Sequence, residues 1–172
     1  MLHDALELCG GGPVAIRYPK GAARQVAEWE VGSGFRARRV REGDTSVCLL
    51  AVGKMLERAL VAADRLSEQG LECTVWDVRC CKPLDPEMLD DATGHRLVLT
   101  LEDGIRDGGV GMQMQDEIER RCPAGRGPHV EVLGVPAQFL PHGKADRILA
   151  RLGLDADGIV AAVRTGLAGL DG

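Results

Sequence analysis

Aromatic residues and long apolar runs are scarce in this sequence. Aromatics make up 3% of the 172 residues, which leaves few side chains on which nucleic-acid bases could stack. No apolar segment approaches the roughly 20 residues of a membrane-spanning helix. The net charge of −5 means that basic residues are not in excess, which argues against a general nucleic-acid binder. What is present, 45% hydrophobic and 27% charged residues, is the composition of a globular protein of about one domain.

Several chemical motifs are also missing. The six cysteines include no C-x-x-C pair and the four histidines show no metal-ligand spacing, so no metal site is predicted. The G-x-S-x-G sequence of serine hydrolases does not occur. The first residues, MLHDALELCGGG, contain two acidic residues and no basic segment, so no signal peptide is predicted. We therefore expect a cytoplasmic protein whose cysteines are reduced and mostly buried.

Strand and helix patterns alternate after Thr45. Continuous apolar runs such as SVCLLAV (46–52) are typical of strands buried on both faces, and the amphipathic segments between such runs predict helices. This alternation predicts an α/β fold: a doubly wound, mostly parallel sheet of about five strands with helices on both faces. We expect strands at 46–52, 72–78, 96–103 and 129–135, and helices at 54–70, 84–93 (starting at Asp85 or Pro86), 108–122, 143–153 and 155–170.

The first 45 residues lack this regularity. Residues 2–9 are expected to form the end of a helix, and Val14–Arg17 a buried strand whose tip carries a cation. Residues 21–45 show no clear periodicity, which is unusual for so long a segment inside one domain. We therefore expect residues 1–20 to be the tail of an upstream domain, 21–45 an interdomain linker, and 46–172 the doubly wound domain. On this interpretation the chain is the C-terminal piece of a larger enzyme.

Arg17 is the strongest candidate for a binding residue. It ends the predicted strand, and ligands of open α/β sheets bind beyond the carboxyl ends of strands. Its guanidinium suits two-point contact with a phosphate or a carboxylate. Pro19 stiffens the turn that follows, and Gly21 lets the chain change direction. A surface salt bridge is the alternative that the sequence leaves open.

A glycine-rich segment, LTLEDGIRDGGVG, leads from a predicted strand into a predicted helix. Gly108, Gly109 and Gly111 could let free backbone N–H groups hold a phosphate. Their spacing matches neither a dinucleotide-binding fingerprint nor a P-loop, and Glu102 and Asp103 would repel an anion. Close packing of the backbone against a neighbouring helix or subunit is the better interpretation.

Three other residues carry weaker signals. The vicinal Cys80 and Cys81 could be redox-active, but neighbouring side chains of an extended segment point in opposite directions. Small apolar core residues are therefore the better interpretation of this pair. His142 has no acidic partner nearby in the sequence, so we expect it to pack or to begin a helix rather than to act in catalysis.

Four segments, taken in order, form a familiar set. They are GPVAIRYPKG, LLAVGKMLERALVAADRLSEQGLECTVWDVRCCKPLD, LVLTLEDGIRDGGVG and VLGVPAQFLPHGKADRILARLGLDADGIV. Together they resemble the C-terminal third of the 1-deoxy-D-xylulose-5-phosphate synthase family, transketolase-like enzymes that use thiamine diphosphate. The resemblance spans essentially the whole chain. The RYPKG box and the FLPHG…GLDADGI ending favour this family over its transketolase relatives.

The resemblance implies a function for the longer enzyme. That enzyme would be a homodimer that condenses pyruvate with glyceraldehyde 3-phosphate, using thiamine diphosphate and Mg²⁺, to give 1-deoxy-D-xylulose 5-phosphate and CO₂ for isoprenoid synthesis. Arg17 would help to hold the phosphate of the acceptor aldehyde. The family's Gly-Asp-Gly…Asn motif and its cofactor-activating glutamate are absent here. We therefore expect this chain alone to be inactive, to lack catalytic, cofactor-binding and metal-binding residues, and to have a structural, dimer-bracing role.

Two alternatives stay open at this point. The middle of the chain also resembles the C-terminal domains of transketolases and of 2-oxoacid dehydrogenase E1 β subunits. A free-standing regulatory or adapter module is the third interpretation. RCCKPLD departs from the synthase pattern, since two cysteines replace the more usual bulky residues.

Overall fold

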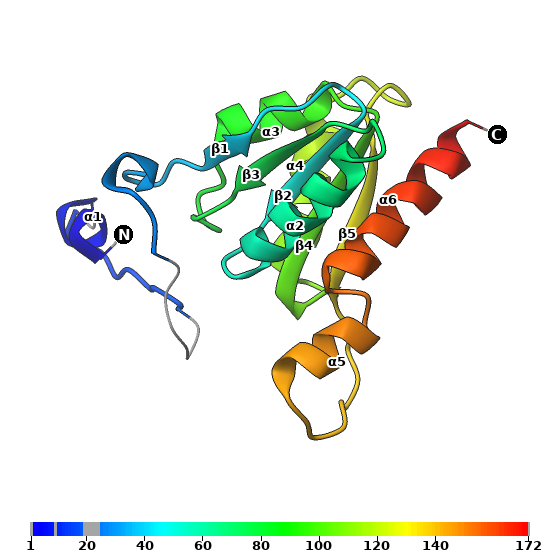
Figure 1. The fold of residues 1–172 in the computed structure, drawn as a ribbon. Coiled ribbons are helices and arrows are strands. Elements are labelled where there is room, and N and C mark those ends of the chain that lie inside the picture. Colours follow the sequence, from blue (N-terminus) through cyan, green and yellow to red (C-terminus); the bar gives the residue numbers. More distant parts are fainter. Residues whose placement is uncertain (1, 9, 19–24, 172) are drawn as a thin grey trace.

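The computed structural model describes residues 2–8, 10–18 and 25–171, and its centre is a five-stranded sheet (Figure 1). The strand order is β1–β3–β2–β4–β5, in which β1 is antiparallel to β3 and the other neighbours are parallel. The strands are β1 (Arg38–Arg41), β2 (Val47–Ala51), β3 (Cys73–Asp77), β4 (Leu97–Ile105) and β5 (His129–Val135). The helices are α1 (Leu2–Leu8), η1 (Glu28–Glu30), α2 (Met55–Ser67), α3 (Pro86–Thr93), α4 (Val110–Arg121), α5 (Ala145–Arg151) and α6 (Ala156–Leu170).

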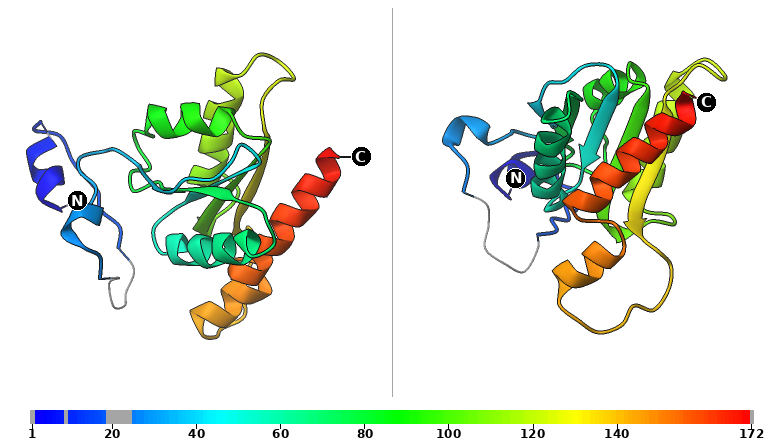
Figure 2. Two further views of the ribbon diagram at one scale, coloured as in Figure 1. Left: turned by 45° about the horizontal axis from the view of Figure 1, so that its top comes forward. Right: turned by 45° about the vertical axis from the view of Figure 1, so that its right-hand side comes forward.

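Helices cover both faces of the sheet, as the sequence predicts (Figure 2). One core packs α2 and α6 against the sheet and includes Leu49 and Leu99. The other packs α3 and α4 against the opposite face and includes Leu50 and Val98. Because successive residues of a strand point to opposite faces, the unbroken apolar runs of β2 and β4 supply both cores at once. The doubly wound α/β prediction is confirmed.

Local signals set the start of α3. The Asp85 side chain accepts a hydrogen bond from the Glu87 N–H at 2.9 Å, and Pro86 occupies the first helical turn. An aspartate at this position satisfies an N–H group that the helix leaves free, and proline is tolerated where no N–H is needed. The other Asp85 oxygen accepts from the Ala37 N–H at 2.7 Å, so the same carboxylate also fixes the chain before β1.

Strand β1 was not predicted. It lies inside residues 21–45, the segment expected to be a linker, and pairs with β3 at the edge of the sheet. Its sequence, RRVR, has little of the apolar character that marks a buried strand. Ion pairs hold it instead: Arg41 contacts Asp64 at 2.6 Å and Glu72 at 3.1 Å. Tertiary contacts, rather than periodicity, make this segment a strand.

The prediction of a strand at Val14–Arg17 is wrong for this structure. Residues 13–18 have no regular secondary structure, and Val14 is 43% exposed. A strand needs a neighbour to pair its backbone groups, and the described residues place none beside this segment. Pro19 and Gly21 lie outside the described residues. The expected helix at residues 2–9 is present as α1.

Within the described ranges, none of the helices combines the length and apolar character needed to cross a membrane.

Candidate functional site at the carboxyl ends of the strands

The sheet has one point at which its winding changes direction. From β2 the chain moves through α2 to β3 on one side, and then crosses to β4 on the other side of β2. Ligands of such sheets bind in the crevice outside the carboxyl ends of the strands at this point. Here Lys54 follows β2 and Asp103 lies in β4, and their charged atoms are 3.4 Å apart. Both side chains are about one-third exposed, at 33% and 35%, so the pair is reachable from solvent.

Glu102 fills the glycine-rich turn next to Asp103. The residue is 6% exposed, and its carboxylate accepts a hydrogen bond from the Gly111 N–H at 3.0 Å. A Cβ atom on Gly109 would lie 2.4 Å from Glu102 Oε1, and one on Gly111 would lie 2.6 Å from Thr100 Oγ1. Gly109 and Gly111 are therefore required by close packing, as the sequence analysis favoured, although the contacts are backbone and side-chain atoms of strands rather than a helix or a subunit. The amino end of α4 already holds an anion, which is the protein's own carboxylate.

Arg17 lies near enough to this region for its charge to act on it. Its positive charge acts on both the Glu102 carboxylate and the Cys81 thiol, although Arg17 itself is exposed. Burial raises the pKa of Glu102, while the N–H groups of Gly111 and Val110 and the charge of Arg17 oppose that rise. The structure thus brings Arg17 and Glu102, two residues that the sequence singled out, to one edge of the sheet.

Cys80 and Cys81 are not core residues, so that prediction is wrong. They lie in the loop after β3, where Cys80 is half-buried and Cys81 is exposed. Partial burial of the sulfur, with Cys80 and the Glu102 charge as further causes, raises the pKa of the Cys81 thiol. The strand ends at Asp77, three residues before the pair, so the alternation of an extended chain no longer applies there.

Arg79 was not identified from the sequence. It stands just past the end of β3 with a φ of 53°, a left-handed backbone that costs a non-glycine residue about 1–3 kcal/mol. Its guanidinium donates to the carbonyl oxygens of Ser33 and Arg36 and lies against Gly32. Arg79 therefore ties residues 32–36 to the carboxyl edge of the sheet. No sequence pattern marks a strained backbone, so only the structure could show it.

One group of described residues has metal-ligand geometry. The ligand atoms of Cys48, Asp91 and His95 lie within 4.8 Å of one another. Each of the two polar members already has protein partners. Asp91 accepts from Trp76 Nε1 at 2.7 Å, and the His95 ring nitrogens contact the Asp91 carbonyl at 3.0 Å and the Thr74 hydroxyl at 3.2 Å. This cluster is a hydrogen-bonded support for β3 and α3.

His142 lies exposed in the loop between β5 and α5. Among the described residues it has no hydrogen bond or ion pair, so neither the packing role nor the helix start that the sequence favoured is present.

Comparison with known proteins matches this geometry to a family. The family described as transketolase, C-terminal domain, matches residues 36–159. A 1-deoxy-D-xylulose-5-phosphate synthase of Anaeromyxobacter sp. (strain Fw109-5) is 42% identical over 170 residues, which cover 95% of this chain and 26% of that protein. The synthase of Thermobifida fusca (strain YX) is 38% identical, with 92% and 25% covered. The chain therefore spans about a quarter of the length of these curated relatives.

Solved structures agree with the fold. A structure described as a split gene transketolase, inactive beta4 tetramer, has a TM-score of 0.74 and 28% identity, and the match covers 86% of this chain and 47% of that one. The transketolase of Campylobacter jejuni has a TM-score of 0.56 and 20% identity, with 75% and 18% covered, and shows the fold alone. On sequence and on structure, the chain belongs to the transketolase C-terminal domain family.

Proposed function

We propose that this chain is the C-terminal region of a 1-deoxy-D-xylulose-5-phosphate synthase. The longer enzyme condenses pyruvate with glyceraldehyde 3-phosphate to 1-deoxy-D-xylulose 5-phosphate and CO₂. One observation carries the proposal: similarity to the synthases extends through 95% of the chain. It therefore includes Arg17, which lies before the 36–159 region shared with transketolases in general.

In this proposal, Arg17 is the residue of this chain that contacts the substrate. Its side chain is exposed, and its charge acts on Glu102 at the carboxyl edge of the sheet, where the Lys54–Asp103 pair also lies. We propose that its guanidinium binds the phosphate of the acceptor aldehyde by charge-assisted hydrogen bonds. Glu102 is not a catalytic acid in this proposal, because its carboxylate is engaged by the amino end of α4.

The described residues do not fit thiamine diphosphate or Mg²⁺. Their glycine-rich turn at a helix start is filled by Glu102, which leaves no place for a diphosphate. The Cys48, Asp91 and His95 cluster is engaged in hydrogen bonds and offers sulfur and imidazole, whereas Mg²⁺ prefers oxygen ligands. We propose that other parts of a cytoplasmic enzyme hold both groups, and that this chain alone is inactive and braces a homodimer. The split transketolase, described as an inactive beta4 tetramer, supports the proposed inactivity of this chain alone.

A chimeric enzyme tests the proposal. This chain replaces the matching quarter of the Anaeromyxobacter synthase, and product formation from pyruvate and glyceraldehyde 3-phosphate is measured. We expect activity within about tenfold of the parent, because interfaces between homologues at this identity are largely kept. The matched control carries the corresponding region of the Campylobacter transketolase and is expected to be inactive. An inactive first chimera that folds and binds thiamine diphosphate would contradict the assignment.

The split transketolase favours a second candidate, in which this chain is a separately encoded subunit. Mass spectrometry of the native gene product distinguishes the two. A chain of roughly four times this length supports the first candidate, since the relatives are matched over 26% of their length. A chain of 172 residues that restores activity when mixed with an upstream subunit supports the second.

A further inference from the structure

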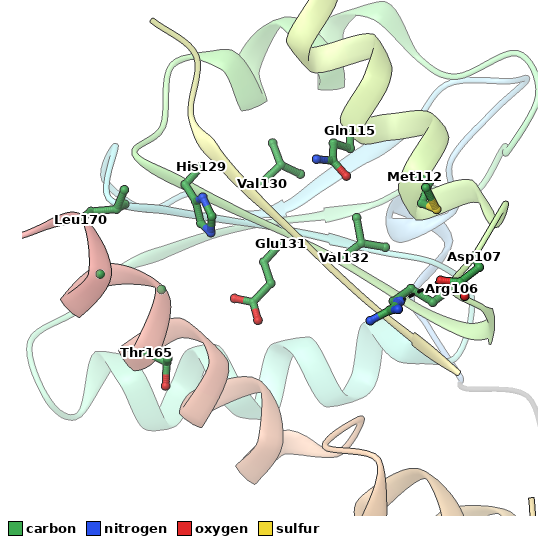
Figure 3. A pocket seen from close by; sticks show the side chains of 12 residues that line it. Arg106, Asp107, Met112, Gln115, His129, Val130, Glu131, Val132, Thr165 and Leu170 are labelled. Carbon is green, nitrogen blue, oxygen red and sulfur yellow. Dashed lines mark hydrogen bonds and ion pairs between the residues drawn. The ribbon is translucent and has the colours of Figure 1, made fainter. Parts of the chain in front are cut away.

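A groove runs along the outer edge of β5, with a cavity volume of about 640 Å³. β5 is the last strand of the sheet, so among the described residues its outer backbone groups have no partner strand. Helix α4 borders the groove on one side and α6 on the other (Figure 3). An edge strand of seven residues between two helices is a place where an additional strand can pair.

The two sides of β5 differ in character. Figure 3 shows Val130 and Val132 on the side of α4, near Met112 and Gln115. On the side of α6 lie His129, Glu131 and the guanidinium of Arg106 (Figure 3). A strand that pairs here must therefore present apolar residues to one side and charges that match Glu131 and Arg106 to the other.

Glu131 and Arg106 lack strong partners within the chain. Glu131 is half-buried and has no ion pair with any described residue; a Cβ on Gly166 would lie 3.6 Å from its carboxylate. Among the described residues Arg106 forms an ion pair only with its chain neighbour Asp107, at 3.0 Å, and both side chains are more than half exposed. The pair at Asp107 is therefore weak. Gly134 lies against Arg106, where a Cβ would come within 3.1 Å of its Cβ, so the missing side chain leaves room beside Arg106.

We propose that the β5 edge is a homodimer surface, in which β5 pairs antiparallel with β5 of a second copy. A two-fold axis at Val132 places Val132 against its own copy, Glu131 opposite Leu133, and His129 opposite Val135. No like charges then lie directly opposite, and the apolar side of β5 continues across the pair. The inference rests on the dimer-bracing role proposed above and names its surface.

Charge complementarity favours a second copy of this chain as the partner at the β5 edge. Arg106 lies one residue past the Ile105–Val135 pair, and Glu131 of the second copy lies opposite Leu133. With strands about 4.8 Å apart and about 3.4 Å per residue, the two backbones are therefore about 14 Å apart. Two extended side chains span that distance, so the two-fold axis forms the ion pair twice. Pairing with a strand that has no cation near Glu131 is unfavourable, because burying the Glu131 charge further without a partner costs free energy. The β5 edge therefore favours pairing with a second copy of this chain over pairing with an uncharged strand.

A charge-exchange cycle on the full chain tests the proposal by sedimentation equilibrium. The wild type is expected to dimerise, and Arg106→Glu and Glu131→Arg to raise the dimer dissociation constant at least about tenfold each. The double variant should restore it to within about threefold. The control Arg151→Glu, which makes the same charge change on exposed α5, should leave it unchanged. Circular dichroism confirms that each variant is folded.

Three results would overturn the inference. They are a monomer at all concentrations up to about 100 µM, a dimer that neither single reversal weakens, and a double variant as weak as the singles. The second result leaves the dimer-bracing role standing and removes only this surface. The synthase assignment depends on the chimera and not on this measurement, so the two can fail separately.

Discussion

The Gly111 N–H donates to the Glu102 carboxylate at 3.0 Å, so that an internal anion closes the amino end of α4. The contact requires glycine at position 111, because a Cβ there would lie 2.6 Å from Thr100 Oγ1 and 2.8 Å from a Val132 methyl group. Gly111→Ala should therefore lower the free energy of unfolding by about 1–3 kcal/mol, the cost of overpacking a well-packed site. Urea denaturation of dilute protein, followed by circular dichroism, measures it.

Gly169→Ala is the matched control. Gly169 also lies in a helix, but nothing is within 4 Å of the position of its Cβ. The same substitution should raise stability there by up to about 1 kcal/mol, because alanine is the better helix former. Equal effects at the two positions would mean that packing against Thr100 and Val132 does not require glycine at position 111.

The pH dependence of stability should reveal the Glu102 charge. Burial raises its pKa above the ordinary value of 4.5, so the folded state binds more protons than the unfolded state as pH rises through that range. Ionisation of Glu102 therefore destabilises the wild type progressively above about pH 4.5. Stability relative to Glu102→Gln should fall from pH 4 to pH 7, as measured by urea denaturation across that range.

Glu117 provides a control of opposite sign. A hydrogen bond from Arg121 lowers the pKa of Glu117 below its ordinary value of 4.5. Its contribution is present above the unfolded-state pKa and is lost as pH falls through the folded-state pKa. The stability of the wild type relative to Glu117→Gln should thus decline toward low pH. Curves of the same sign for the two glutamates would refute the assignment of their environments.

Strand β1 should stabilise the doubly wound domain. A chain of residues 36–172 keeps the pairing with β3, the Arg41 ion pairs with Asp64 and Glu72, and the Asp85 contact to Ala37. A chain of residues 46–172 loses them all. We expect both to fold and the longer one to be more stable by at least about 2 kcal/mol, since each hydrogen bond contributes about 0.5–1.5 kcal/mol. The denaturant midpoints of the two chains measure this difference. Equal midpoints would mean that β1 does not stabilise the domain and belongs to the linker.

Arg17→Ala in the synthase chimera should impair one substrate selectively. Loss of a charge-assisted contact of about 1.5–3 kcal/mol lowers kcat/KM for glyceraldehyde 3-phosphate at least about tenfold. Turnover of a non-phosphorylated aldehyde, which never made the contact, should hardly change. Arg17→Lys should recover only part of the loss, because an ammonium cannot reproduce the two-point geometry. If both acceptors suffered equally, Arg17 would have a structural role.

The cysteines should differ in reactivity while the protein is folded. Cys48 and Cys73 are 0% exposed, and burial raises the pKa of Cys73 to about 12. Cys81 is exposed, so among the described cysteines it should react first with a thiol reagent despite its own raised pKa. Mass spectrometry after brief labelling identifies the modified residue. After denaturation all six thiols should titrate, and a missing pair would reveal a disulfide.

The sequence by itself determined the doubly wound core. Buried parallel strands are apolar on both faces, and the helices that cover them are apolar on one face. The sequence patterns of β2, β4, α2 and α4 therefore predict these elements without coordinates. The start of α3 could also be predicted from the sequence, because Asp85 and Pro86 act locally, within one helical turn. The spacing of the glycine-rich turn and its acidic neighbours favoured close packing over a phosphate site.

Only the tertiary structure decided the edges of the sheet and the contents of the candidate site. β1 is held by arginines that meet acids from distant segments, and Val14–Arg17 is not a strand because no neighbour pairs with it. Glu102 meets Gly111, and Arg79 takes a left-handed backbone beside residues 32–36, through contacts that no periodicity records. Burial in a core leaves a repeating pattern in the sequence, whereas pairing at an edge depends on which surfaces the folded chain brings together.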